Sequence, residues 1–145
     1  ILNEDGTISN NEFSGANGQL TIQARKRAES QQSGSQVYIE QHGNNNVAEW
    51  LQQGPNNTFK LKQDGDGNIH KGYLSGEDNL IEVLQQGNNN KLIHELQGNG
   101  MDLGVSQFGN EHELIHIEKS GTSPAYQIRQ EGDHGMKVKI EHESY

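Results

Sequence analysis

Carboxylate and imidazole side chains crowd together near the end of the chain, in Glu111-His112-Glu113 and in His116-Ile117-Glu118. Neighbouring groups of these types can act as general acid and general base. In a β-strand, however, successive side chains point to opposite faces, so Glu111 and Glu113 would lie on one face and His112, His116 and Glu118 on the other. The pattern therefore predicts no catalytic residues, and we expect a protein that is not an enzyme.

Two further patterns resemble metal sites. Asp64-Gly65-Asp66-Gly67-Asn68 looks like the start of a calcium-binding loop, but it lacks the later glutamate of an EF-hand, so an ordinary turn is expected. His94 and His116 lie 22 residues apart. Neutral imidazoles can stack in a core, and a metal or pH role for the two histidines stays an open alternative. We predict no metal site and no cofactor.

The elements that must position these side chains are marked by glycines that recur every 11 residues, with a slip of one residue after Gly109. These turn glycines are Gly43, Gly54, Gly65, Gly76, Gly87, Gly98, Gly109, Gly121 and Gly132. Asparagine follows the early glycines by three residues, at Asn46, Asn57, Asn68, Asn79 and Asn90. Glutamine precedes most of them by two, so the unit reads Gln-x-Gly-x-x-Asn followed by five residues.

The chemistry of this unit favours strands over helices. An 11-residue period can mark a right-handed helical supercoil, but each glycine would cost a helix about 1 kcal/mol. Segments such as Val37–Gln41 and Asn57–Gln63 instead alternate with period two, as strands do. Glycine and asparagine tolerate positive φ, so each Gly-x-x-Asn segment can reverse the chain between strands.

Two units make one rung of 22 residues, a strand, an arc and a second strand. Written in 22s, the first strands give two apolar columns, with the core residues Val37, Ile39, Phe59, Leu61, Ile81, Val83, Leu103, Val105, Tyr126 and Ile128. A third column consists of Gln41, Gln63, Gln85, Gln107 and Gln130. Inward amides would be costly alone, but stacked amides can bond to one another. We predict an all-β fold, a two-sheet parallel β-solenoid that stacks into a cross-β amyloid fibre.

The repeats divide the chain into an N-terminal segment and a solenoid. Residues 1–34 do not carry the 11-residue spacing, although Thr7-Ile8 and Leu20–Ala24 give weak strand signals. We expect this segment to pair with the first rung or with a neighbouring subunit. The five repeats span about 35–56, 57–78, 79–100, 101–122 and 123–145.

Composition limits the function classes. The formal net charge is −9, which argues against nucleic acid as a partner because phosphate binding needs clustered positive charge. No apolar run approaches the roughly 20 residues that span a bilayer, so no membrane span is expected. The sequence starts at Ile1 rather than Met, which suggests a processed and exported chain. Cysteine is absent, so repetition rather than disulfides must hold the fold together.

One complete repeat resembles the curlin repeat of bacterial curli subunits, Ser-x5-Gln-x-Gly-x-x-Asn-x-Ala-x3-Gln. The matching residues are Ser35, Gln41, Gly43, Asn46, Ala48 and Gln52. Later copies depart from it: His70 and Leu74 replace the alanine and the last glutamine, and the fourth copy has Met101, His112, Leu114 and Glu118. The resemblance extends over about Ser35 to Tyr145.

This resemblance implies a secreted, extracellular structural protein that polymerises with itself into a cell-surface amyloid fibre of the biofilm matrix. It also implies a nucleator subunit and a dedicated outer-membrane secretion apparatus as partners. It leaves open whether the chain is a major subunit or a nucleator. The main alternative is a monomeric secreted β-solenoid adhesin or ligand-binding module, which would need capped ends. The last predicted strand, Met136–His142, is followed by no capping helix, and this favours polymerisation.

Overall fold

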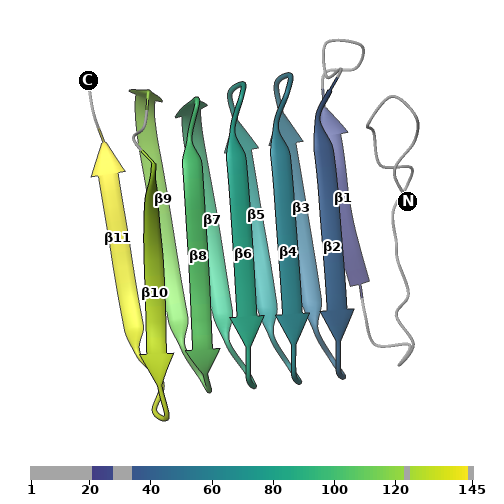
Figure 1. The fold of residues 1–145 in the computed structure, drawn as a ribbon, viewed down its shortest axis with the longest axis vertical. Helices are drawn as coiled ribbons and strands as arrows, with labels where there is room; N and C mark the ends of the chain where they lie inside the picture. The colour runs from purple at the N-terminus through teal and green to yellow at the C-terminus, as the bar shows by residue number, and fades with distance from the viewer. Residues whose placement is uncertain (1–20, 28–33, 123–124, 144–145) are drawn as a thin grey trace.

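The computed structural model describes residues 21–27, 34–122 and 125–143, with side chains described for residues 34–119 and 125–143. Within these residues all regular elements are β-strands (Figure 1). They are β1 (Thr21–Arg27), β2 (Gln36–His42), β3 (Val47–Gln53), β4 (Thr58–Asp64), β5 (Ile69–Ser75), β6 (Leu80–Gln86), β7 (Lys91–Asn99), β8 (Asp102–Gly109), β9 (Glu113–Thr122), β10 (Tyr126–Gly132) and β11 (Lys137–Glu143).

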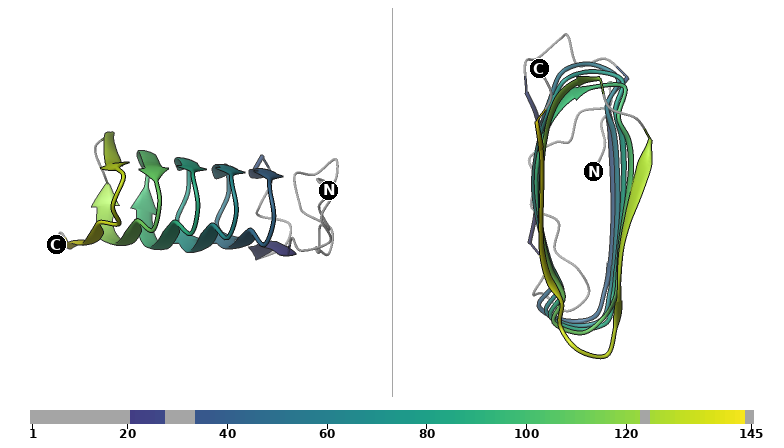
Figure 2. Two further views of the ribbon diagram at one scale, coloured as in Figure 1. Left: turned by 90° about the horizontal axis from the view of Figure 1, so that it is seen from below. Right: turned by 90° about the vertical axis from the view of Figure 1, so that its left-hand side faces the viewer.

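The strands form two parallel sheets that face each other. The odd-strand sheet has the order β1-β3-β5-β7-β9-β11, and the even-strand sheet has the order β10-β8-β6-β4-β2. Viewed along the axis on which the strands stack, the chain traces one flattened coil (Figure 2, right). Val37 pairs with Phe59 and Ala48 pairs with His70, each 22 residues later. The predicted β-solenoid of 22-residue rungs is therefore confirmed.

The later rungs absorb inserted residues without losing parallel pairing. Leu103 of β8 pairs with Tyr126 of β10, 23 residues later. Between β7 and β9 the register shifts after Gln97, so one extra residue lies on the β9 side, in the interval that contains Gly121. Gly121, expected as a turn glycine, lies near the end of β9, as Gly98 lies near the end of β7, and the inserted residue forms a bulge there.

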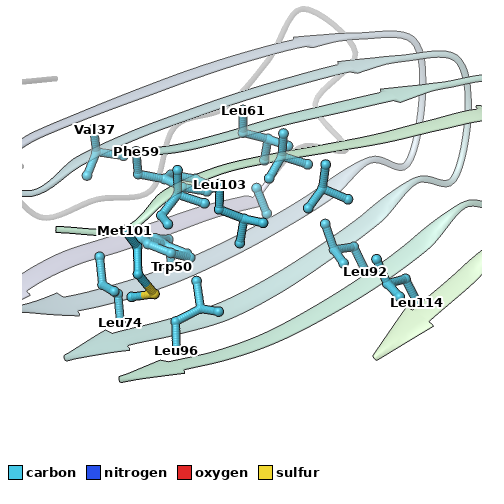
Figure 3. Packing of buried hydrophobic residues seen from close by; sticks show 14 residues of the cluster. Val37, Trp50, Phe59, Leu61, Leu74, Leu92, Leu96, Met101, Leu103 and Leu114 are labelled. Atoms are coloured by element: carbon cyan, nitrogen blue, oxygen red, sulfur yellow. The ribbon is translucent and has the colours of Figure 1, made fainter. Parts of the chain in front are cut away.

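A single apolar layer fills the space between the sheets (Figure 3). Its buried side chains are Val37, Ala48, Trp50, Phe59, Leu61, Leu74, Ile81, Val83, Leu92, Leu96, Met101, Leu103, Val105 and Leu114. Three residues of the expected core, Ile39, Tyr126 and Ile128, are only partly buried. They lie on β2 and β10, the two edge strands of the even-strand sheet, where a neighbouring rung covers one side only.

Charged side chains on the outer faces follow the same register. Lys62 lies 3.5 Å from Glu40, and Lys71 lies 3.5 Å from Glu49, in both cases one rung away. The Lys60 ammonium likewise lies 3.7 Å from the carboxylate of Glu82. Because like charges stacked in register would repel, these pairs help to fix which residues stack, although each exposed pair contributes only about 0.2–1 kcal/mol.

Candidate functional site: buried amide ladders and open strand edges

A continuous ladder of glutamine side chains runs along the inside of the even-strand sheet. Gln41 donates its amide to Gln63, and Gln63 donates to the Gln85 carbonyl at 2.7 Å. The next bonds, from Gln85 to Gln107 and from Gln107 to Gln130, measure 2.8 and 2.7 Å. Each rung thus satisfies the amide of the rung before it, and a polar column can stay buried at low cost.

The ladder is also tied to the opposite sheet and has a direction. The amide nitrogen of Gln85 donates to the Ile69 carbonyl at 3.0 Å, and Gln107 donates to the Lys91 carbonyl at 2.9 Å. All donors point toward the C-terminal rung. At the N-terminal end, the side-chain oxygen of Gln41 has no hydrogen-bond partner among the described residues. The ladder therefore begins with a buried acceptor that has no described partner.

Asparagines connect successive arcs in a second set of ladders. The Asn68 amide donates to the Gly87 carbonyl at 2.8 Å, while the Asn68 side-chain oxygen accepts from the Asn90 backbone nitrogen at 3.1 Å. The same two roles recur at the other asparagines of the repeat, Asn46, Asn57, Asn79 and Asn90. Backbone groups that a tight arc leaves unpaired are thereby satisfied one rung away.

Close stacking explains why the arcs require glycine. Gly65 has a φ of +126°, and a Cβ atom built there would lie 1.9 Å from the Gly87 carbonyl oxygen. Both the positive φ and the missing side chain are thus needed at this column. Residues with a side chain occupy some of the other left-handed positions, such as Asn45 and Asn89 at φ 58° and Glu111 at φ 62°.

Ser35 and His112, which were not predicted as ladder members, make the hydrogen bonds that asparagine makes in the other arcs. The Ser35 hydroxyl accepts from the Asn57 nitrogen at 3.0 Å and donates to the Gly54 carbonyl at 3.2 Å. In the arc between β8 and β9, the His112 ring contacts the Phe108 carbonyl at 2.9 Å and accepts from the Met136 nitrogen at 3.2 Å. The 11-residue spacing of His112 from Met101, and of Met101 from Asn90, was the available signal.

The inner face of the odd-strand sheet is less uniform. Trp50 stacks on Phe59 with ring centroids 3.8 Å apart, and its ring occupies the space that a side chain at Gly72 would need. Beyond Trp50 and Phe59, a row of histidine rings continues along the axis on which the strands stack. His70 and His94 are 5.4 Å apart, and His94 and His116 are also 5.4 Å apart. Bulk at one rung is compensated by glycine at the next, as close packing requires.

The three histidines of this row are buried as neutral rings. Burial lowers the pKa of His70 to about 3. The pKa of His94 lies well below its ordinary value because of burial and because of the neighbouring His70 and His116. Burial also lowers the pKa of His116 to about 4, although the charge of Glu118 acts in the opposite direction. Neither nitrogen of His70 or His94 has a hydrogen-bond partner among the described residues.

A polar cluster lies at the C-terminal end of the ring row. The Tyr126 hydroxyl donates to Glu118 at 2.8 Å and lies 2.8 Å from the His116 ring nitrogen. His142 of the last strand lies 2.6 Å from the other carboxylate oxygen of Glu118. Burial and the adjacent carboxylate raise the pKa of Tyr126. Buried Glu118 therefore has tyrosine and histidine partners, the arrangement that a carboxylate inside a fold requires.

The residues with possible acid-base or metal chemistry are placed as follows. His112, His116 and Glu118 are buried, while Glu111 and Glu113 lie on the outer side. In the Asp-Gly segment, an Asp66 carboxylate oxygen accepts from the Asn44 backbone nitrogen at 2.7 Å, as in an ordinary stacked turn. The side chains that the structure describes include no group of three or more histidines and acids arranged to hold a metal ion.

Both ends of the described solenoid present strand edges. At one end the edges are β1 and β2, and at the other they are β11 and β10 (Figures 1 and 2). The C-terminal strand β11 is largely exposed, and its inward column position Val138 is 38 % accessible. The backbone groups along the outer side of an edge strand are free to pair with a further strand. This arrangement can add a rung at either end.

A comparison with protein-family models matches residues 33–65 to the curlin associated repeat. These residues include β2, β3 and β4, the first complete rung and the start of the second. Comparisons with curated proteins and with solved structures give no match. Among the residues that the structure describes, none belongs to a helix that could span a membrane.

Proposed function

We propose that this chain, whose residues 33–65 are a curlin associated repeat, is a non-enzymatic structural subunit of an extracellular curli-like amyloid fibre. The fibre would serve adhesion and biofilm matrix at the cell surface. Its partners would be further copies of the chain, a nucleator subunit where the chain is itself a major subunit, and an outer-membrane secretion apparatus. The proposal covers both a major subunit and a nucleator.

Two features that occur together carry this proposal: the strand edges at both ends of the described solenoid, and the side-chain ladders that repeat from rung to rung. A chain that adds at β11 and β10 would find strands that, among the described residues, have a neighbouring strand on one side only. Repetition of the same pairing generates stacked parallel strands perpendicular to a fibre axis, which is the cross-β arrangement.

The ladders make such an addition favourable without a large apolar surface. Hydrophobic residues make up only 29 % of the chain. At the N-terminal end, the buried side-chain oxygen of Gln41 has no hydrogen-bond partner among the described residues. An added rung that carries glutamine at this position would satisfy that acceptor, since stacked amides bond to identical amides.

Seeded growth of the purified chain tests the proposal. Fresh protein should elongate from sonicated seeds without a lag, and aligned fibres should diffract at about 4.7–4.8 Å along the axis and about 10 Å across it. Sedimentation of protein incubated at high concentration shows whether the chain instead stays monomeric. A stable monomer that seeds do not recruit would contradict the fibre and would favour a monomeric solenoid adhesin.

A further inference from the structure

The two ends of the described solenoid are not equivalent. At the N-terminal end the odd-strand sheet extends one strand beyond the even-strand sheet, because β1 continues past β3 while β2 is the last even strand. At the C-terminal end β10 and β11 belong to the same rung. Among the described strands, β11 of one copy therefore meets β1 of the next when two copies stack with the same direction, and one strand position stays between β10 of the first copy and β2 of the second.

The register of the odd-strand sheet fixes which residues would meet there. Glu141 shares its position with Arg25 through an unbroken series of partners in β9, β7, β5 and β3: Ile117, Glu95, Tyr73 and Leu51. In the same way Glu143 shares the position of Arg27. If the sheet continues in register from one copy to the next, both glutamates of β11 fall opposite arginines of β1.

We propose that β11 of one copy pairs in parallel with β1 of the next, with Glu141 opposite Arg25 and Glu143 opposite Arg27, and that these charges set the polarity of the fibre. The proposal rests on the proposed function, since it names the contact through which the fibre would grow. The occupant of the β11 edge is thus a second copy of this chain, presenting its N-terminal strand.

Four of the five other positions of the two strands agree with this pairing, while the fifth places His142 opposite Lys26. Lys137 and Lys139 of β11 share the positions of the neutral residues Thr21 and Gln23. At the inward column positions, Val138 would meet Ile22 and Ile140 would meet Ala24. Like charges are nowhere opposed at an outward position, and apolar residues meet at two positions of the column that is buried inside the solenoid.

Charge pairs of this kind already stack within the chain. The Lys62–Glu40 and Lys71–Glu49 pairs each join residues at one register position of neighbouring strands, with nitrogen–oxygen distances of 3.5 Å. At the C-terminal edge, Glu141 lies 3.3 Å from Lys139 of its own strand, and its side chain stays 49 % accessible. An incoming arginine would therefore share a carboxylate that is still half exposed to solvent.

One competing arrangement is also complementary in charge. Two copies of β11 in antiparallel pairing would place Lys137 opposite Glu143 and Lys139 opposite Glu141. This arrangement joins two C-terminal ends, stops growth there and breaks the parallel columns that both sheets otherwise keep. It does not involve β1, and variants of β1 therefore distinguish it from the proposed junction.

The decisive experiment measures seeded elongation of full chains with reversed charges. In E141R/E143R and in R25E/R27E, each homotypic junction opposes like charges, so each variant alone should elongate about tenfold more slowly than the unaltered chain at low salt, and high salt should reduce the difference. A 1:1 mixture should recover, because every junction of an alternating copolymer opposes unlike charges. The fourfold variant with both reversals should recover on its own.

The matched control is E77R/D102R, which reverses two exposed acids in the middle of the solenoid and should elongate like the unaltered chain. Circular dichroism verifies that each variant folds. Impaired E141R/E143R with normal R25E/R27E would overturn the proposal, because β1 would then not be the partner of β11. Normal growth of both variants, or no recovery in the mixture, would overturn it while leaving the fibre itself intact. Failure of the unaltered chain to grow would instead count against the proposed function.

Discussion

Acidification should destabilise the solenoid well before its carboxylates are neutralised, because three histidines are buried as neutral rings. His70, His94 and His116 have pKa values lowered by burial, to about 3 for His70 and about 4 for His116. In the unfolded chain the same rings titrate near pH 6.5. As the pH falls below 6.5, the unfolded chain takes up protons that the folded chain does not. Stability is therefore complete above pH 6.5 and is lost progressively below it, toward the folded-state pKa values.

The size of the effect follows from this difference in proton uptake. Each histidine that is protonated only in the unfolded chain lowers the free energy of unfolding by about 1.4 kcal/mol per pH unit. Between pH 6.5 and pH 5 this amounts to about 2 kcal/mol per ring, or about 6 kcal/mol for the three. A total of this size is comparable to the whole stability of many domains, about 5–15 kcal/mol. For a chain of this length the corresponding fall in Tm is about 12–24 °C.

Thermal unfolding of freshly desalted protein, followed by circular dichroism at pH 7.5, 6.5, 5.8 and 5.0, measures this effect. The His70→Leu variant should lose about a third of the pH dependence, because leucine already occupies the same column at Leu92 and carries no proton. The matched control is His134→Leu, at an exposed turn position, which should keep the full dependence. A Tm that stays constant from pH 7.5 to pH 5.0 would refute the burial of neutral histidines in this row.

Two substitution pairs test the arcs and the ladder. Gly76→Asn should destabilise the fold by at least about 2 kcal/mol in urea titrations, because a Cβ there would lie 1.8 Å from the Gly98 carbonyl oxygen. The matched variant Gly100→Asn should change stability by less than about 0.5 kcal/mol, because a Cβ there has no atom within 4 Å. Gln85→Glu should slow seeded elongation, because a buried carboxylate cannot donate to Gln107. Gln86→Glu, at the exposed neighbouring position, should elongate normally. Equal elongation rates for the two variants would argue against the inward ladder.

The fold could be predicted from the sequence because the same constraint is repeated. A single Gly-x-x-Asn segment is a weak turn signal, but its recurrence every 11 residues leaves strands and arcs as the consistent interpretation. Alternation within Asn57–Gln63 then assigns Phe59 and Leu61 to the core, where both side chains are buried. Period and alternation together are enough to specify the sheets and their register.

The 22-residue register places bulky Trp50 over Gly72, as the structure shows. Other contacts between side chains of different rungs could not be predicted in this way, because they depend on how each side chain is oriented. His112 departs from asparagine in the repeat, yet its ring reaches the Phe108 carbonyl of the arc. The cluster of Glu118 with Tyr126 and His142 joins three strands, and Tyr126 counted in the sequence only as an apolar residue. Even the stacking of Trp50 on Phe59 depends on the distance between sheets, which no spacing in the sequence encodes.

The two sheets differ in how regular their inward columns are. In the even-strand sheet each inward column repeats the same type of residue, and a ladder of identical glutamines extends equally well with any chain that carries glutamine at this position. The columns of the odd-strand sheet change from rung to rung, from Trp50 to Gly72 to His94, so a misaligned strand meets the wrong volume. If copies of the chain stack, the uneven volumes of these columns would favour one alignment of the odd-strand sheets. The edges of both sheets carry opposite charges at one register position, Glu141 and Arg25 in the odd-strand sheet and Arg129 and Glu40 in the even-strand sheet.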